Sequence, residues 1–233
     1  MTTFERVAFF DVDETLIRVK SMFDFLRHWL AGQGDNGRRY EEAAAGLHGI
    51  ARAGRPRTEV NRAYYRLFAG ARWDDLIVSG REWYARYREG PDAFVTATVR
   101  ALAAHRLAGD TVVLVSGSFR ACLDPLTEEL GADRVLCSEP VVDPDGTLTG
   151  EVRRPMIGVA KVEAVSETLA GMSIAPDVCY CYGDHASDLE MLARVGNPRV
   201  VGADPVLTEH AGRFGWPVLP AATGPLPLTR ATY

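Results

Sequence analysis

The sequence predicts an α/β protein with a parallel sheet, helices on both faces of that sheet, and a helical bundle inserted after the first strand. Short apolar segments alternate with helix-like segments through most of the chain, and this alternation is typical of parallel sheets covered on both faces. Residues 21–88 instead show apolar residues at helical spacing and few strand signals, which predicts a bundle. The 233 residues, 47% of them hydrophobic, are enough for one core that carries a large insertion.

The first strand is predicted at 5–11, a short apolar run that ends in an aspartate. Four helices are predicted next, near 21–32, 38–53, 57–69 and 74–88, with glycine or proline between them. We therefore divide the chain into a core domain of residues 1–19 plus 90–233 and a helical cap domain of residues 20–89.

Strand and helix signals alternate from Pro91 onward. The sequence predicts helices near 91–107, 119–130, 159–170, 187–194 and 205–213, strands at 111–116, 134–138, 178–183, 199–202 and 216–219, and a hairpin at 141–152 around Asp145-Gly146. The segment after Pro220 is rich in Pro, Thr and Ala, so we expect it to pack loosely.

Composition and charge argue against several classes of protein. The net charge of -5 disfavours nucleic acid as a partner. The first residues lack the basic and long apolar regions of a signal peptide, and the longest apolar runs are too short to cross a bilayer. We expect a cytoplasmic monomer or homodimer that binds neither nucleic acid nor a membrane.

The four cysteines are set among apolar neighbours. Cys179 and Cys181 are two residues apart and would share one face of a strand. A metal site at this pair is conceivable, but no histidine or second cysteine pair accompanies it, so we interpret the thiols as small buried hydrophobes.

Four polar features follow predicted strands or open the helices beside them. Asp11 and Asp13 follow the first strand, Ser116 and Gly117 follow the strand at 111–116, and Lys161 lies near a helix start. Each has an ordinary alternative, namely an acidic turn, a helix N-cap and a surface lysine, respectively. A hydroxyl with free backbone N–H groups can also bind an anion, and a lysine can neutralise a carboxylate and a phosphate.

The fourth feature is the pair Asp184 and Asp188, just after the strand at 178–183. Paired carboxylates at a strand end suit a hard cation such as Mg²⁺, which prefers oxygen ligands. His185 lies between them, and we expect it to face solvent or to support the ligands. Because ligands bind at the carboxyl ends of parallel strands, the four features together favour one site over four coincidences.

These motifs resemble those of the haloacid dehalogenase superfamily of phosphatases. DVDET at 11–15, the serine of SGS at 116–118, the lone Lys161 and GDHASD at 183–188 stand in the family's order. The resemblance covers about residues 5–20 and 91–219, and it implies a Rossmann-like core. A helical cap directly after the first motif, and the ending at 196–219, resemble the phosphoserine phosphatase branch.

The resemblance implies a role for each motif residue. Asp11 attacks phosphorus and becomes an aspartyl phosphate, while Asp13 protonates the leaving alcohol and then activates water. Ser116, Gly117 and Lys161 bind the phosphoryl group. Asp11, the backbone carbonyl of Asp13 and Asp184 bind Mg²⁺, and Asp188 supports that shell, partly by orienting Lys161 or water.

Two positions depart from the family's commonest pattern. Glu14 stands where many relatives have Gly or Ser, although other phosphatases of the superfamily also carry Glu. Lys20 occupies the place of a glutamate that holds the substrate ammonium in phosphoserine phosphatases, so we predict weak activity on phosphoserine. The cap residues expected to face the substrate are Lys20, Ser21, Phe23 and Arg57, whereas Tyr64 and Tyr65 are expected mainly in the cap's own core.

The sequence therefore predicts a Mg²⁺-dependent phosphatase whose substrate is a small phosphate monoester, such as a sugar, amino-sugar, polyol or amino-alcohol phosphate. A phosphotransferase or mutase on the same scaffold is an alternative, as is a catalytically silent phosphate-binding protein. The resemblance disfavours a dehalogenase, because the first motif of dehalogenases lacks the second aspartate, which is Asp13 here.

Overall fold

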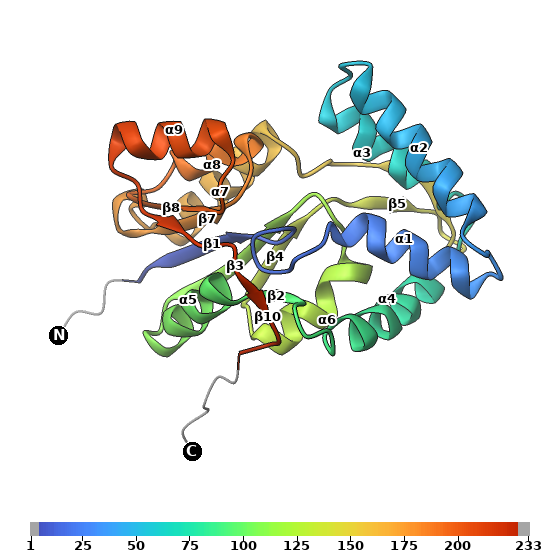
Figure 1. Ribbon diagram of the computed structural model, residues 1–233, viewed down its shortest axis with the longest axis horizontal. Helices are drawn as coiled ribbons and strands as arrows, with labels where there is room; N and C mark the ends of the chain where they lie inside the picture. Colours follow the sequence, from blue (N-terminus) through green and yellow to red (C-terminus); the bar gives the residue numbers. More distant parts are fainter. Residues whose placement is uncertain (1–4, 228–233) are drawn as a thin grey trace.

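A six-stranded parallel sheet forms the centre of the protein in a computed structural model that describes residues 5–227 (Figure 1). The strands lie in the order β4-β3-β1-β7-β8-β9, and each is parallel to its neighbours. Their bounds are β1 Val7–Asp11, β3 Thr111–Ser116, β4 Arg134–Cys137, β7 Tyr180–Gly183, β8 Asn197–Val201 and β9 Val218–Leu219. This confirms the predicted α/β class.

Helices cover both faces of the sheet. Because successive side chains of a strand point to opposite faces, Val7 and Phe9 join one hydrophobic cluster, and Ala8 and Phe10 join the other. The first cluster is completed by α7 (Val159–Met172), α8 (Leu189–Leu192) and α9 (Pro205–Phe214), and the second by α5 (Thr96–Leu107) and α6 (Arg120–Leu130). Figure 1 shows the sheet between these two layers.

The predicted helical insertion follows β1. It consists of α1 (Ser21–Gly32), α2 (Arg38–Arg52), α3 (Arg57–Arg66) and α4 (Trp73–Tyr87). The rings of Phe25, Tyr64 and Phe68 pack around Phe119, which directly precedes α6. The bundle therefore shares one hydrophobic cluster with a face of the sheet, and the domain boundaries at residues 20 and 89 stay a prediction.

The predicted hairpin is present as β5 (Pro140–Val142) and β6 (Leu148–Val152). It joins the helical insertion: Leu148 exchanges 2.8 Å backbone hydrogen bonds with Gly70 and Ala71, between α3 and α4. The left-handed Gly150 (φ +84) lies so close to the end of α3 that a Cβ there would be 3.3 Å from Arg66 Cα. The hairpin belongs to the core in sequence but lies against the cap.

Three local predictions differ from the structure. The helix predicted from 91 begins only at Thr96, because β2 (Phe94–Val95) pairs with β10 (Thr223–Gly224). The segment after Pro220 is therefore not loosely packed at these residues, and 228–233 lie outside the described part. The predicted helix at 187–194 is a 3₁₀ turn, Ala186–Asp188, followed by the short α8, and a second 3₁₀ turn spans Pro176–Val178. Pieces this short carry no periodicity that could reveal them.

All four cysteines are buried and free. Cys179 and Cys181 belong to the cluster beneath α7, α8 and α9, so the interpretation of these thiols as buried hydrophobes is confirmed. Within residues 5–227, no helix is long and apolar enough to cross a membrane.

Candidate active site

Three neighbouring strands end at the same place. Asp11 is the last residue of β1 and Ser116 is the last of β3, while Asp184 follows β7 directly. Because β1 lies between β3 and β7, and all three are parallel, these side chains converge at the carboxyl edge of the sheet. Residues more than a hundred positions apart thereby form one site.

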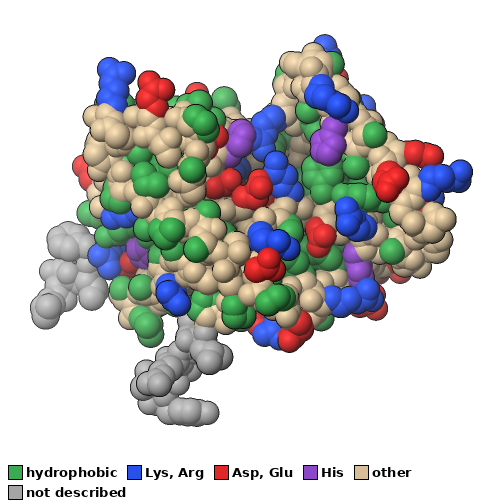
Figure 2. Space-filling view, viewed as in Figure 1, with side chains coloured by type: hydrophobic (Ala, Val, Ile, Leu, Met, Phe, Trp, Pro, Cys, Tyr) green, Lys and Arg blue, Asp and Glu red, His purple; other side chains and the backbone are tan. Residues whose placement is uncertain are grey.

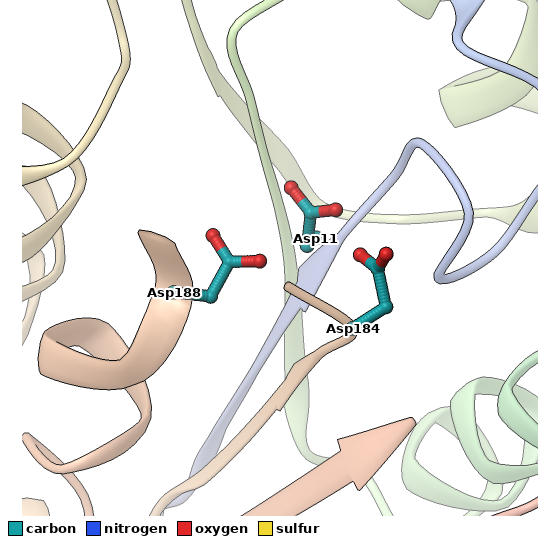
Figure 3. Close-up of side chains that lie close together, drawn as sticks. All are labelled: Asp11, Asp184 and Asp188. Carbon is teal, nitrogen blue, oxygen red and sulfur yellow. The ribbon is translucent and has the colours of Figure 1, made fainter. Parts of the chain in front are cut away.

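Three carboxylates face one another at this edge (Figure 3). Asp11, Asp184 and Asp188 each offer an oxygen, and these oxygens lie within 4.8 Å of one another. Asp188 reaches the cluster from the 3₁₀ turn that follows β7. Oxygen-only donors at this spacing match the ligand preference of a hard divalent cation.

Lys161 is buried beside these carboxylates. It lies in the first turn of α7, and its Nζ donates to Asp11 Oδ1 at 2.5 Å and to Asp188 Oδ1 at 2.7 Å. Burial lowers the pKa of Lys161, but the two carboxylates outweigh that effect and raise it above the ordinary value. Lys161 is therefore positively charged in the folded protein, and it makes the contact with Asp188 that was expected from the sequence.

The carboxylates outnumber the lysine, and burial raises the pKa values of two of them, Asp11 and Asp184. The pKa of Asp11 is raised well above its usual range by burial, although Lys161 opposes the shift. Burial, together with Asp188, raises the pKa of Asp184 to about 6, while the hydrogen bond from Thr15 Oγ1 (2.9 Å) opposes this. The cluster is therefore short of positive charge, a condition that a bound cation relieves.

Asp13 lies on the same loop but is held separately from the cluster. Its Oδ1 accepts a 3.0 Å hydrogen bond from the backbone N–H of Ser21 at the start of α1. Burial raises the pKa of Asp13, while its hydrogen bonds with Ser21 lower it. The shift favours a carboxyl that can carry a proton, and Ser21 positions Asp13 from within the buried interior.

The turn after β3 is fixed by hydrogen bonds from several elements. Ser116 Oγ accepts from the Ser118 N–H at 3.1 Å, so its hydroxyl hydrogen is free to donate elsewhere. The Gly117 carbonyl accepts from Asn61 Nδ2 at 2.9 Å, Ser138 Oγ at 2.8 Å and Tyr65 OH at 3.3 Å. Asn61 and Tyr65 belong to α3, so the cap helps to fix the phosphate-binding turn expected from the sequence.

A cavity of about 610 Å³ opens above these groups and extends into the cap. Figure 2 shows the molecular surface hollowed between its two upper lobes, with charged and histidine side chains gathered there. Lys20, Phe23 and Arg57 line the cavity as expected, whereas Ser21 does not. Tyr64 also lines the cavity, but it is buried, and its hydroxyl donates a hydrogen bond to the Met22 carbonyl.

Two of the predicted cap residues already have partners at the mouth of the cavity. Lys20 Nζ lies 3.4 Å from Glu14 Oε2, and Glu14 is held in the left-handed region at φ 63. Arg57, at the start of α3, donates to Ser187 Oγ at 2.9 Å and lies 2.8 Å from Nδ1 of His185. Arg57 therefore connects the cap to the loop that carries Asp184 and Asp188.

Sequence reasoning missed several residues of the site. Thr15 orients Asp184, Asn61 orients Gly117, and Ser187 receives Arg57. His185 is exposed, as expected, and its contact with Arg57 was not foreseen. The cavity wall formed by α2 was missed as well: Tyr40, Leu47, His48 and Ala51. The spacing of Tyr40, Leu47 and Ala51 is that of one helix face and could have revealed this wall, but nothing in the sequence says what the face would meet.

The family model for haloacid dehalogenase-like hydrolases matches residues 8–193. The matched range contains all four motifs and the helical insertion. The chain belongs to the haloacid dehalogenase-like hydrolases. This confirms the resemblance drawn from the motifs.

Two relatives of this hydrolase match nearly its whole length. A Streptomyces azureus protein named for inhibition of morphological differentiation is 34% identical over 91% of this chain and 77% of its own length. A probable phosphatase of Mycobacterium tuberculosis is 32% identical over 91% of this chain and 74% of its own length. The solved structure of a Bordetella pertussis protein of unknown function has a TM-score of 0.82 at 25% identity, covering 94% of this hydrolase and 99% of that chain.

Phosphoserine phosphatases are matched as well. That of Archaeoglobus fulgidus is 30% identical over 89% of this hydrolase, which spans only 55% of that relative's length. A solved phosphoserine phosphatase with a phospho-aspartyl intermediate analogue shares the fold, with a TM-score of 0.67 at 21% identity over 95% of each chain. The hydrolase is thus similar to phosphoserine phosphatases in fold and over part of their sequence, and its substrate is a separate question.

Proposed function

We propose that this hydrolase is a Mg²⁺-dependent phosphatase that removes phosphate from a small-molecule monoester through a phosphorylated Asp11. The observation that carries the proposal is the contact of Asp11 with the buried Lys161, within a carboxylate cluster that forms the floor of a cavity. The names of the relatives, a probable phosphatase and a phosphoserine phosphatase, support the same chemistry.

The donor set fits the proposed Mg²⁺. Lys161 occupies one oxygen of Asp11 and one of Asp188, and Thr15 occupies one oxygen of Asp184. The second oxygen of each carboxylate therefore remains available as a ligand. With the backbone carbonyl of Asp13, Asp11 and Asp184 would hold the ion. When bound, it would neutralise charge on the phosphate and the carboxylates.

The chain's own groups would perform two steps. The Asp11 carboxylate attacks phosphorus, the bond from phosphorus to the ester oxygen breaks, and Asp13 gives its proton to the departing alcohol. Asp13 then takes a proton from water as that water attacks phosphorus, which releases inorganic phosphate and restores Asp11. Asp13 accepts a hydrogen bond from the Ser21 N–H, apart from the cluster, and this position suits a group that exchanges protons with the alcohol and with water.

Hydrogen-bond donors and a positive charge around the phosphoryl group would stabilise the transition state. Ser116 has a hydroxyl hydrogen to donate because its oxygen already accepts from Ser118. Lys161 stays protonated between two carboxylates. It can therefore interact with Asp11 and with the phosphoryl oxygens in turn while keeping its positive charge. Preorganised donors of this kind supply much of the stabilisation of a phosphoryl-transfer transition state.

A phosphotransferase or mutase would use the same first step and pass the phosphoryl group to a second substrate. Release of inorganic phosphate in the absence of any acceptor distinguishes the phosphatase from that alternative. A silent binding protein would show no turnover at all.

The test is hydrolysis of p-nitrophenyl phosphate with and without Mg²⁺. Asp11→Asn should lower kcat by at least about a thousandfold, because removal of a nucleophile typically costs that much. The fold should persist, since Lys161 keeps its bond to Asp188. Asp145→Asn in the exposed hairpin turn is the matched control and should retain wild-type turnover. Full activity of Asp11→Asn, or wild-type turnover unaffected by a chelator, would refute the proposal.

A further inference from the structure

The cavity is larger than the phosphoryl site, and its far wall is mainly apolar. Three cap helices each present one face to it: Met22, Phe23, Asp24 and Arg27 of α1, Tyr40, Leu47, His48 and Ala51 of α2, and Arg57, Val60, Asn61 and Tyr64 of α3. On α2 and α3 the spacing of these residues is that of a single helical stripe. The cap therefore turns apolar faces toward the reaction centre.

The size of the cavity indicates a substrate with a substantial leaving group. Pockets of roughly 300–1,000 Å³ hold drug-sized molecules, and the cavity measures about 610 Å³. A phosphorylated amino acid or a three-carbon polyol would leave much of the α2 wall in contact with water. Exposure of apolar side chains to water is unfavourable. The cavity therefore favours a substrate whose leaving group covers the α2 wall.

The charges of the wall argue against a substrate ammonium group. Within the described residues, Asp24 is the only carboxylate that α1, α2 and α3 present to the cavity, and its Oδ2 accepts from Trp83 Nε1 at 2.8 Å. Glu14, at the mouth, is paired with Lys20. Phe23 and His48 stack face to face with ring centroids 5.3 Å apart, which provides a flat ring surface between α1 and α2.

We propose that the preferred substrate is a phosphate monoester whose leaving group is an apolar chain or ring without an ammonium group. This inference rests on the proposed phosphatase function. The leaving group lies against Phe23, Leu47, Ala51 and Val60, and these residues determine specificity. The phosphate occupies the end of the cavity at Asp11 and Lys161, and the apolar body extends toward α2.

The first experiment compares primary alkyl phosphates from ethyl to octyl, below their micellar concentrations, with phosphoserine and glycerol phosphate. All the alkyl leaving groups are primary alcohols, so the chemical step is matched and only the apolar length changes. We expect kcat/KM to rise by up to about fourfold for each methylene that becomes buried. 2-Phenylethyl phosphate provides the ring-containing arm. A series that does not rise with chain length, or that is outperformed by phosphoserine, would overturn the inference.

The second experiment uses matched variants on α2. Both Ala45 and Ala51 are exposed on α2, but only Ala51 of the two lines the cavity. Ala51→Gln should reduce the octyl-to-ethyl ratio of kcat/KM several-fold, while Ala51→Met, of similar size but apolar, should preserve or increase it. Ala45→Gln should leave the ratio unchanged. Equal effects of Gln and Met at position 51 would show that size rather than polarity matters, against the inference.

The two levels of the proposal fail separately. Loss of Mg²⁺-dependent p-nitrophenyl phosphate hydrolysis in Asp11→Asn tests the phosphatase function alone. If that hydrolysis is present while the alkyl series is flat, the phosphatase function stands and only the apolar leaving group is refuted.

Discussion

Lys161 shows what a single residue contributes to this site. A buried ammonium is destabilising by several kcal/mol unless it is paired and hydrogen-bonded, and here two carboxylates satisfy it. Each carboxylate adds to the stability of the arrangement, and when one is lost the other still pairs with the lysine. A lone lysine in a helical sequence usually faces solvent, so its burial is itself a sign of function.

Lys20 is the residue on which the predicted discrimination against phosphoserine depends. Its charge is partly offset by Glu14, but the pair still presents no net negative charge to a substrate ammonium. Lys20→Glu would place two carboxylates together at the mouth. We expect this variant to raise the ratio of phosphoserine to glycerol phosphate hydrolysis several-fold, measured as kcat/KM. Lys20→Met separates loss of the positive charge from gain of a negative one, and an unchanged ratio in both variants would remove Lys20 from the specificity of the enzyme.

At the scale of elements, the start of α3 is attached to the loop after β7. Arg57 makes this connection through Ser187 and His185. Burial and the nearby Arg57 lower the pKa of His185, which keeps its ring neutral and able to accept. The contact closes the cavity at the side of the carboxylate cluster.

Arg57→Ala should open this side of the cavity. We expect KM for p-nitrophenyl phosphate to increase about three- to tenfold, since one hydrogen-bonded charge contributes roughly 1 kcal/mol. Amide hydrogen exchange in α3 should become faster as well. Arg55→Ala is the matched control, because Arg55 only pairs with Glu59 one turn along the exposed face of the same segment. Equal changes in both variants would mean that a general loss of charge, not the contact, is responsible.

The crossing of α4 and α6 depends on the absence of a side chain at Gly80. A Cβ at this position would lie 1.8 Å from the carbonyl oxygen of Ala121, so the helices would have to separate. Gly80→Ala should lower the free energy of unfolding by about 1–3 kcal/mol, as overpacking does. Gly46 in α2 has nothing within 4 Å of its would-be Cβ, so Gly46→Ala should raise it by about 0.5–1 kcal/mol. Urea denaturation measures both, and the same sign for the two variants would contradict this account.

At the scale of the whole molecule, cap and core share one hydrophobic cluster. Phe25 and Phe68 from the cap meet Phe119, which connects β3 to α6. A shared cluster of buried aromatic rings opposes independent motion of the two parts. We infer that access to the cavity depends mainly on α2, which packs against the cap helices α1 and α3.

Protons and the proposed cation compete for the same carboxylates, so stability should depend on both. Asp184 has a pKa raised from 3.8 to about 6, so the folded, metal-free protein binds its proton more tightly than the unfolded chain. Its contribution to stability is present below pH 3.8 and is lost as the pH rises through about 6. Without metal, the wild type should therefore lose stability relative to Asp184→Asn over this range.

Thermal unfolding of both proteins between pH 4 and pH 8 measures this difference. Addition of Mg²⁺ should stabilise the wild type at the upper end of the range and have less effect on Asp184→Asn, because ligand binding to the folded state raises its stability. A difference that stays constant with pH, or an equal effect of Mg²⁺ on both proteins, would contradict the argument.

Much of the fold could be predicted because its signals are local. Apolar runs such as TVVLV, helix-like periodicity and glycine breaks lie within short windows of sequence. The strand pair β2 and β10 could not be predicted, since two-residue strands gain their stability from pairing between positions more than a hundred residues apart. The contact of the hairpin with α3 was invisible for the same reason.

The sequence by itself determined the family, the sheet and its inserted bundle, and the residues that follow the strands, because these depend on local pattern and motif order. Only the tertiary structure decided that Lys161 is buried between Asp11 and Asp188, that Arg57 turns to the loop after β7, and that α2 forms an apolar wall. Burial and pairing of a side chain depend on what the rest of the chain brings to it. A helical stripe looks the same in sequence whether it meets a core or lines a cavity.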